Sequence, residues 1–135
     1  MIRATKRHRK WLKSLTEASS EGYWYEILNH KFFIDWEQGE KTSFSSVSIL
    51  TGENEGLAYL SFCKVLPEYR GFGLQRRHLI ARLRYAKKLG CTEVITYTKT
   101  WNIYSNNNLI LLGFTMYKPI CKYAGANMLY WRKEI

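Results

Sequence analysis

The sequence predicts a single domain of mixed α/β class over residues 1–135, in which helices flank both sides of a central β-sheet. Three observations support this class. The near-continuous apolar run Leu57–Leu66 suits a central strand that is covered on both faces. An amphipathic helical pattern follows it, and a second strand-like run lies at Glu93–Thr98. A strand, a helix and a strand over about 40 residues form a βαβ unit, whose strands should be parallel and joined by a right-handed crossover.

The chain before the central strand predicts a short strand, a helix and two further strands. Trp11, Leu12 and Leu15 recur at helical spacing with polar residues between them. β-branched and alternating residues mark the later strands, and a polar turn separates them from the central strand. We expect these elements at Met1–Thr5, Lys6–Ser19, Lys31–Glu37 and Thr42–Leu50, with the turn at Thr51–Gly56.

The helix after the central strand should pack through one apolar stripe and end near Gly90. His78 is expected on its exposed side, among arginines and lysines. The stripe consists of Leu79, Ile80, Leu83 and Ala86. Further along, Ser105 is expected to cap a short helix that Gly113 ends, and two closing strands should follow. These strands are expected at Phe114–Lys118 and Met128–Lys133.

Composition and cysteine usage place the chain among folded proteins of a reducing compartment. An apolar content of 46% and an aromatic content of 16% exclude a disordered chain. No apolar stretch approaches the roughly 18 residues that a membrane span needs, and no apolar segment typical of a secretory signal follows the basic N-terminus. Cys63, Cys91 and Cys121 are widely spaced and form no CxxC motif. We therefore expect reduced thiols, a cytoplasmic location and no metal site.

The formal charge of +10 is unevenly distributed. From Arg70 onward, twelve basic residues are accompanied by only two acidic ones, Glu93 and Glu134. A second basic cluster spans Arg3–Lys13. A field of this sign favours polyanionic partners, namely a phosphorylated cofactor, nucleic acid or an acidic protein, and does not by itself distinguish them.

The stretch from Val65 to Arg76 is the most informative part of the chain. The apolar strand stops at Pro67, turns through Gly71 and Gly73, and enters a helix at once. Such a turn directs several backbone N–H groups and the positive end of a helix dipole to one point, which suits a phosphate or pyrophosphate. The third glycine of a dinucleotide-binding turn is absent, as is the Lys-Ser/Thr pair of a P-loop. An anionic cofactor is therefore the first hypothesis.

A second block of sequence makes the hypothesis more specific. Asn102–Phe114 begins Asn-x-x-Ser and ends Leu-Gly-Phe after a short predicted helix. Together with the segment Val-x-Pro-Glu-x-Arg-Gly-x-Gly-Leu that starts at Val65, it resembles the GNAT superfamily of acyl-CoA-dependent N-acetyltransferases, in particular small bacterial and phage members. The match covers about residues 57–118. Residues 1–56, where the acceptor usually binds in this family, match only in the order of their elements.

The resemblance implies a GNAT-like fold in which two parallel strands splay apart and hold the pantetheine arm of acetyl-CoA between them. The backbones of Cys63, Lys64 and Val65 would bond to that arm, and the Val65 N–H would stabilise the tetrahedral oxyanion. Asn102 and Ser105 would also contact the CoA arm. The pyrophosphate would be held by Arg70, Gly71, Phe72, Gly73, Leu74, Gln75 and Arg76.

The implied reaction is direct transfer of the acetyl group from acetyl-CoA to a primary amine within a ternary complex, without a metal. A protein lysine or N-terminus and a small-molecule amine fit equally well. Most of the rate would come from positioning the amine against the thioester, which is worth up to about 7–11 kcal/mol. The amine must arrive unprotonated, which requires a base or a water wire.

Three positions depart from the family pattern. Gln75 stands where Gly or Ala is usual, and the extra side chain is tolerable there if it points outward. Leu109 stands where many members have the tyrosine that protonates the departing thiolate. Tyr97 stands where some protein-acetylating members have a glutamate base, and tyrosine is a poor base. Tyr104 and Ser105 are the nearest polar substitutes, and Tyr97 could bind a water.

Two alternatives remain open at this point. An enzyme of the same fold could acylate a nucleic-acid base or a nucleic-acid-bound protein, as the basic segment Arg3–Lys13 suggests. A catalytically silent CoA-binding or interaction module would fit Leu109 and the absence of the usual base. The sequence also leaves the acyl-chain length and a homodimer open. For a phage-encoded member, the expected location would be the host cytoplasm.

Overall fold

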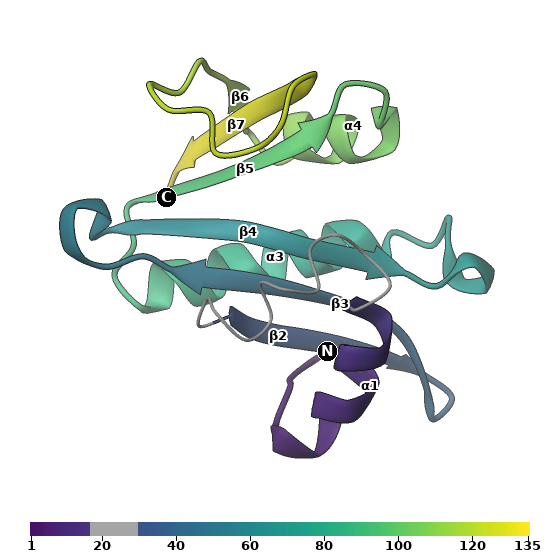
Figure 1. The fold of residues 1–135 in the computed structure, drawn as a ribbon. Coiled ribbons are helices and arrows are strands. Elements are labelled where there is room, and N and C mark those ends of the chain that lie inside the picture. The colour runs from purple at the N-terminus through teal and green to yellow at the C-terminus, as the bar shows by residue number, and fades with distance from the viewer. Residues whose placement is uncertain (17–29) are drawn as a thin grey trace.

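The computed structural model describes residues 1–16 and 30–135, in which seven strands form one mixed sheet (Figure 1). The order across the sheet is β1-β2-β3-β4-β5-β7-β6. The strands are β1 (Ile2–Arg3), β2 (His30–Glu37), β3 (Glu40–Ile49), β4 (Leu57–Val65), β5 (Glu93–Lys99), β6 (Thr115–Met116) and β7 (Met128–Glu134). All of them were predicted from the sequence, with ends that shift by a few residues.

Helices cover both faces of the sheet, as predicted. On one face, Leu12 of α1 packs in a cluster with Phe32, Ile34, Phe44 and Phe62. On the other face, α3 lies behind β3 and β4 in Figure 1, and α4 joins its cluster. The α-helices are α1 (Arg9–Thr16), α3 (Leu74–Lys88) and α4 (Ile103–Leu111), and the 3-10 turns are η1 (Lys6–His8), η2 (Gly52–Asn54) and η3 (Pro67–Tyr69). The last residues of the helix expected at Lys6–Ser19 lie outside the described residues. No helix in the described ranges is long and apolar enough to cross a membrane.

The βαβ unit is present, and its two strands separate along their length. β4 and β5 are parallel and pair at three positions, from Leu57 with Glu93 to Tyr59 with Ile95. Beyond Tyr59 the two strands diverge, as Figure 1 shows. The sheet is therefore opened at the carboxyl ends of its central strands, and the glycine turn follows β4 at that end.

A β-bulge in β4 lets the strand contribute to both sides of the core. Ser45 of β3 pairs with Cys63, whereas Val47 pairs with Leu60, so β4 has one extra residue across from β3. The shift sends Phe62 to the cluster beneath α1, while Leu60 packs on the α3 side. The bulge lies where β4 and β5 have just separated.

The buried face of α3 differs from the predicted stripe. Ile80 and Leu83 are only half-buried. The fully buried positions are Leu74, His78, Leu79, Arg82 and Ala86. His78 is therefore in the core, and its prediction as a surface residue was wrong. Its ring is compatible with burial because both nitrogens are hydrogen-bonded: Nδ1 lies 2.6 Å from Ser45 Oγ and Nε2 lies 2.8 Å from Ser43 Oγ.

The short helix α4 begins differently from the prediction. Asn102, not Ser105, is its capping residue, because Asn102 Oδ1 accepts the Ser105 N–H over 3.2 Å. Asn is as good a cap as Ser, and the helix starts at Ile103, three residues earlier than a Ser105 cap would allow.

Candidate functional site

The glycine turn has the backbone geometry that only glycine adopts easily. Gly71 has φ 88° and Gly73 has φ 77°, and Gly73 is the residue that leads into α3. A Cβ placed on either residue would meet no atom within 4 Å. The space above the turn is therefore open to a ligand.

The N–H groups of this turn are available to an anion. Among the described residues, no backbone or side-chain acceptor takes the N–H groups of residues 71–76, and the first such bond runs from Arg77 N–H to Gly73 O. They include the first N–H groups of α3, which carry the positive end of the helix dipole. A cavity of about 540 Å³ borders the turn. It is lined by Cys63, Lys64, Val65, Tyr69, Arg70, Gly71, Leu74, Gln75, Asn102, Tyr104 and Ser105. The donors therefore suit a diphosphate.

The end of β4 directs further N–H groups toward the gap between β4 and β5. Leu66 N–H donates to Thr42 O over 2.9 Å, and in an antiparallel ladder alternate residues point toward the partner strand. The N–H groups of Cys63 and Val65 therefore point away from β3, to the side where β5 has separated from β4. The carbonyl of Val65 is taken by Arg70 Nε at 3.1 Å.

Side chains of α3 and α4 meet across the gap. Gln75 Nε2 donates to Ser105 Oγ over 2.6 Å, and Asn108 Nδ2 donates to Gln75 Oε1 over 2.8 Å. The Gln75 side chain is accommodated without pointing outward, because two polar partners on α4 hold its amide at the cavity wall. The gap itself is a cleft of about 280 Å³, whose lining includes Gln75, Ser105, Tyr97 and Leu109.

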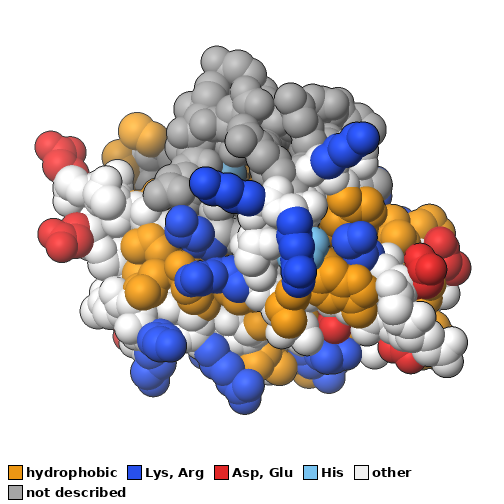
Figure 2. All heavy atoms as spheres, turned by 90° about the horizontal axis from the view of Figure 1, so that it is seen from below, with side chains coloured by type: hydrophobic (Ala, Val, Ile, Leu, Met, Phe, Trp, Pro, Cys, Tyr) orange, Lys and Arg blue, Asp and Glu red, His pale blue; other side chains and the backbone are white. Residues whose placement is uncertain are grey.

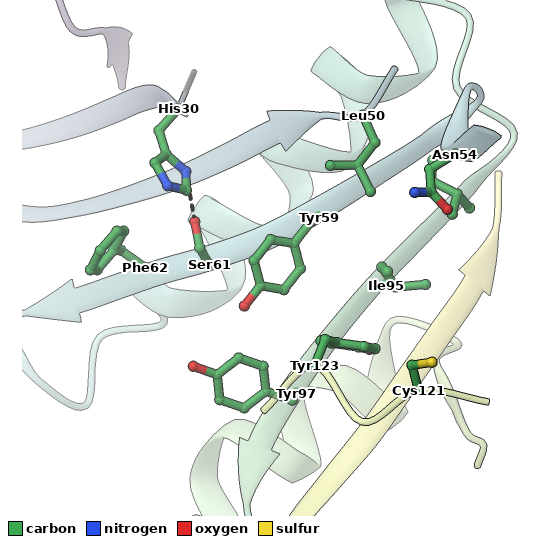
Figure 3. Close-up of a pocket in the computed structure, with 11 residues that line it drawn as sticks. His30, Leu50, Asn54, Tyr59, Ser61, Phe62, Ile95, Tyr97, Cys121 and Tyr123 are labelled. Atoms are coloured by element: carbon green, nitrogen blue, oxygen red, sulfur yellow. Dashed lines mark hydrogen bonds between the residues drawn. The ribbon is translucent and has the colours of Figure 1, made fainter. Parts of the chain in front are cut away.

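A third cavity, of about 440 Å³, lies beside Tyr97 (Figure 3). Tyr59 and Tyr97 stack with ring centroids 6.3 Å apart, and Tyr123 meets both rings edge-on. His30 and Ser61 border the same space, and no acidic residue is among its described lining residues. We call this cavity the tyrosine pocket.

Polar side chains connect the tyrosine pocket to the bulge in β4. His30 Nδ1 lies 3.0 Å from Ser61 Oγ, and Figure 3 shows the ring pointing at that hydroxyl. Ser61 Oγ lies 2.6 Å from Ser46 Oγ, which accepts the N–H of Phe62 over 3.1 Å. A hydrogen-bond chain thus leads from the pocket to the extra residue of β4.

The predicted site residues divide into three groups. Most of the expected CoA contacts line the first cavity, but Phe72 is 76% exposed, and Gly73 and Arg76 are not part of its wall. Tyr104 also lines the first cavity and is 54% exposed. Tyr97 is the third case: it is absent from the lining of the first cavity and instead lines both the cleft and the tyrosine pocket.

Sequence reasoning did not identify several residues that border the site. His30, Ser61 and Tyr59 line the tyrosine pocket, and Arg82 lines the cleft. The serines that recur along β3 were a usable signal, since buried hydroxyls need polar partners. The partners lie more than a dozen residues away along the chain, so no local pattern reveals them.

One face of the molecule is basic. Figure 2, which views the molecule from below, shows Lys and Arg side chains spread over that face with hydrophobic side chains between them. In the part of the chain that the structure describes, no cluster of His, Cys, Asp and Glu is arranged to hold a metal ion. Burial raises the pKa of Tyr123 above its ordinary value, so that its hydroxyl stays protonated as it donates to Thr96 O.

Solved structures share this fold. A ribosomal-protein-alanine N-acetyltransferase from Brucella melitensis has a TM-score of 0.77 at 17% identity, over 99% of this chain and 98% of its own. A putative acetyltransferase from Salmonella typhimurium, with its cofactor acetyl-CoA, has a TM-score of 0.78 at 17% identity, over 98% and 91%. A ribosomal-protein-S18-alanine N-acetyltransferase from Escherichia coli has a TM-score of 0.79 at 15% identity, over 99% and 92%.

No curated protein matches the chain in sequence. The model of the acetyltransferase (GNAT) family, however, matches residues 4–114, which include the glycine turn, the splayed strands and the start of the segment after α4. The match spans most of the chain and agrees with the architecture and with the donor-rich turn. The chain belongs to the acetyltransferase (GNAT) family.

Proposed function

We propose that this protein transfers the acetyl group of acetyl-CoA to a primary amine by direct transfer in a ternary complex. The observation that carries the proposal is the run of N–H groups at residues 71–76, which have no acceptor among the described residues, next to a cleft between β4 and β5. That arrangement offers donors to a diphosphate and a channel to an extended arm. The solved relative from Salmonella typhimurium, which carries acetyl-CoA, supports the same choice of donor.

The chain's own residues have distinct roles in this proposal. The glycine turn binds the diphosphate, and the N–H groups of Cys63 and Val65 bond to the pantetheine arm. The Val65 N–H stabilises negative charge on the thioester oxygen as the amine attacks. Asn102 and Ser105, which line both the first cavity and the cleft, contact the arm from the side of α4.

The amine proton is accepted at the boundary between the cleft and the tyrosine pocket. Tyr97 lines both, and its hydroxyl binds the water that accepts the amine proton. Ser105 and Tyr104 lie on the CoA side, where they supply hydrogen bonds to the donor. The tyrosine pocket receives the acceptor, and its lack of a described acidic side chain favours an amine carried on an apolar or aromatic body.

Two measurements test the proposal. Coenzyme A should raise the thermal midpoint of unfolding, since a ligand at 100 times its dissociation constant adds about 2.7 kcal/mol of stability. Release of the CoA thiol from acetyl-CoA should then be followed with a panel of primary amines, including alanine-terminated peptides and aryl-substituted alkylamines. An absence of binding at millimolar coenzyme A would reject the proposal.

The basic face favours a second candidate, in which the acceptor amine is presented on nucleic acid. Lys6, Arg7 and Lys10 are exposed at the start of the chain. Retention on immobilised RNA or DNA should decrease steeply with salt and fall when these three residues are changed to Gln. Retention that survives the triple substitution would exclude this surface as the contact.

A further inference from the structure

Arg82 is a buried arginine in the middle of α3, and only 2% of it is exposed. Its Nε donates to the carbonyl of His78 over 3.2 Å. Its Nη1 donates to two carbonyls, Ser46 O at 3.1 Å and Phe62 O at 3.2 Å. Those carbonyls lie on β3 and β4 beside the bulge, so the guanidinium is held rigidly under the point where β4 and β5 separate.

No carboxylate in the described part of the chain neutralises the charge of Arg82. No ion pair within the described residues includes it, and Nη2 makes no hydrogen bond among those residues. Burial lowers the pKa of Arg82 from its ordinary value, but a guanidinium remains charged in proteins. A buried cation with an unused donor gains from an anion nearby.

Arg82 is part of the wall of the cleft between β4 and β5. Cys63 lines the same cleft, and the positive charge of Arg82 opposes the rise in the Cys63 thiol pKa that burial causes. The field of the guanidinium therefore reaches a sulfur atom in the cleft. Leu109, 3% exposed, occupies the wall as an apolar residue with no proton to donate.

We propose, on the basis of the function proposed above, that Arg82 is a catalytic residue whose guanidinium stabilises the CoA thiolate that leaves the tetrahedral adduct, in place of a proton donor. The amine nitrogen attacks the thioester carbon, and the carbonyl π electrons move to oxygen. When these electrons return to re-form the C=O bond, the C–S bond breaks and its electron pair leaves with the sulfur. The amide retains the acyl group, the amine proton passes to water, and the thiolate departs as an anion beside Arg82 and takes a proton from solvent on release.

A charge can replace an acid here because a thiolate is a weakly basic leaving group. The ordinary pKa of a thiol, about 8.5, lies only slightly above neutral pH, so the leaving group needs stabilisation rather than full protonation. The other ionisable groups among the described residues that line the cleft are Cys63, Tyr97 and Lys99. His78, on the same helix, is neutral, because burial lowers its pKa to about 3. Lys99 is the one rival cation among the described lining residues, and its ammonium lies 5.4 Å from the ring of Trp101.

The test measures the acidity of the bound coenzyme A thiol in the intact protein. Thiolate absorbance is titrated against pH for the complex with coenzyme A, and the complex with desulfo-coenzyme A is subtracted to remove the protein's own tyrosines and cysteines. We expect the bound thiol to have a pKa about 1–3 units below that of free coenzyme A. A bound thiol that titrates like the free one overturns the proposal without any variant.

Variants show which residue lowers the pKa of the bound thiol. Arg82→Met should return the thiol pKa to within about 0.5 units of the free value, whereas Arg82→Lys should retain part of the shift. Arg84→Met removes an exposed arginine of the same helix and should leave the shift intact. Lys99→Met should also leave the shift in the thiol pKa intact. If the shift disappears in Lys99→Met but persists in Arg82→Met, Arg82 is not its source and the proposal is refuted. Calorimetry with desulfo-coenzyme A separates the two proposals: loss of all binding contradicts the proposed function, whereas binding without a thiol shift contradicts only the role of Arg82.

Discussion

Gln75 Nε2 lies 2.6 Å from Ser105 Oγ, so that a residue next to the glycine turn is bonded to the first turn of α4 across the mouth of the cleft. Asn108 donates to the other end of the same amide. The two bonds set the separation between α3 and α4, which carry opposite walls of the proposed CoA site. A glycine or alanine at position 75 could not form this connection.

Removing the connection should weaken coenzyme A binding. A net hydrogen bond is worth about 1 kcal/mol, so we expect Gln75→Ala and Asn108→Ala each to raise the dissociation constant by about 3–10-fold. Isothermal titration calorimetry measures the change. Asn107→Ala is the matched control, because Asn107 is exposed on the same helix, and its dissociation constant should equal that of the wild type. Equal affinities in all three variants would show that the hydrogen bonds of Gln75 to α4 do not contribute to coenzyme A binding.

Gly73→Ala should affect both stability and cofactor binding. Its φ of 77° costs an alanine about 1–2 kcal/mol, and the added Cβ would project into the open space above the unbonded N–H groups. Gly39, with φ 83° in the turn between β2 and β3, provides the control. Urea unfolding should show similar losses for Gly73→Ala and Gly39→Ala. Only Gly73→Ala should lose affinity for coenzyme A, and an equal loss in both would argue against a diphosphate at the turn.

The βαβ unit and the glycine turn could be predicted because their signals are local. Pro67 ends the strand, Gly71 and Gly73 supply the left-handed conformations, and the helical pattern starts immediately afterwards. The family resemblance rested on the same short segments, and the family match confirms it. The separation of β4 from β5 followed from that resemblance and not from any periodicity.

The polar core could not be predicted in the same way. His78 was predicted as a surface residue on a basic helix, and Arg82 was not singled out. The hydrogen-bond partners of both side chains on β3 are more than 30 residues away in the sequence. A helical pattern shows which residues share a face, but it does not show that serines will satisfy a histidine on that face. Burial of a polar side chain depends on such long-range partners, and the serine-rich strand was read only as a strand.

His78 should make the fold sensitive to mild acid. Burial and the nearby charge of Arg82 lower its pKa to about 3, whereas an unfolded chain has the ordinary value of about 6.5. Below about pH 6.5 the unfolded state binds a proton that the folded state does not, so stability decreases as the pH falls. At pH 5 the loss should be about 2 kcal/mol relative to pH 7.5. Urea unfolding at several pH values measures it.

The matched variant for this dependence is His78→Gln, which keeps hydrogen-bonding capacity and cannot titrate. Its stability at neutral pH should be lower, but its curve between pH 7 and pH 5 should be flatter than that of the wild type. His8, whose pKa is also lowered by burial, remains in both proteins and cancels in the comparison. Parallel curves would mean that His78 becomes protonated in the folded state.

Tyr97→Phe tests the assignment of proton handling to the boundary between the cleft and the tyrosine pocket. The ring of Tyr97 stacks on Tyr59 and should stay in place without its hydroxyl, so the pocket keeps its shape. If the hydroxyl binds the water that accepts the amine proton, kcat should fall by about 10–100-fold, while coenzyme A affinity and thermal stability change little. The fall should be largest at low pH, where the amine is mostly protonated.

Tyr85→Phe, on the α3 side against Phe33, is the control and should leave kcat unchanged. A Tyr97→Phe protein with wild-type kcat across the pH range would reduce Tyr97 to a wall of the pocket. The proposed proton acceptor would then move to Ser61 and His30, whose Oγ and Nδ1 atoms lie 3.0 Å apart beside the same pocket.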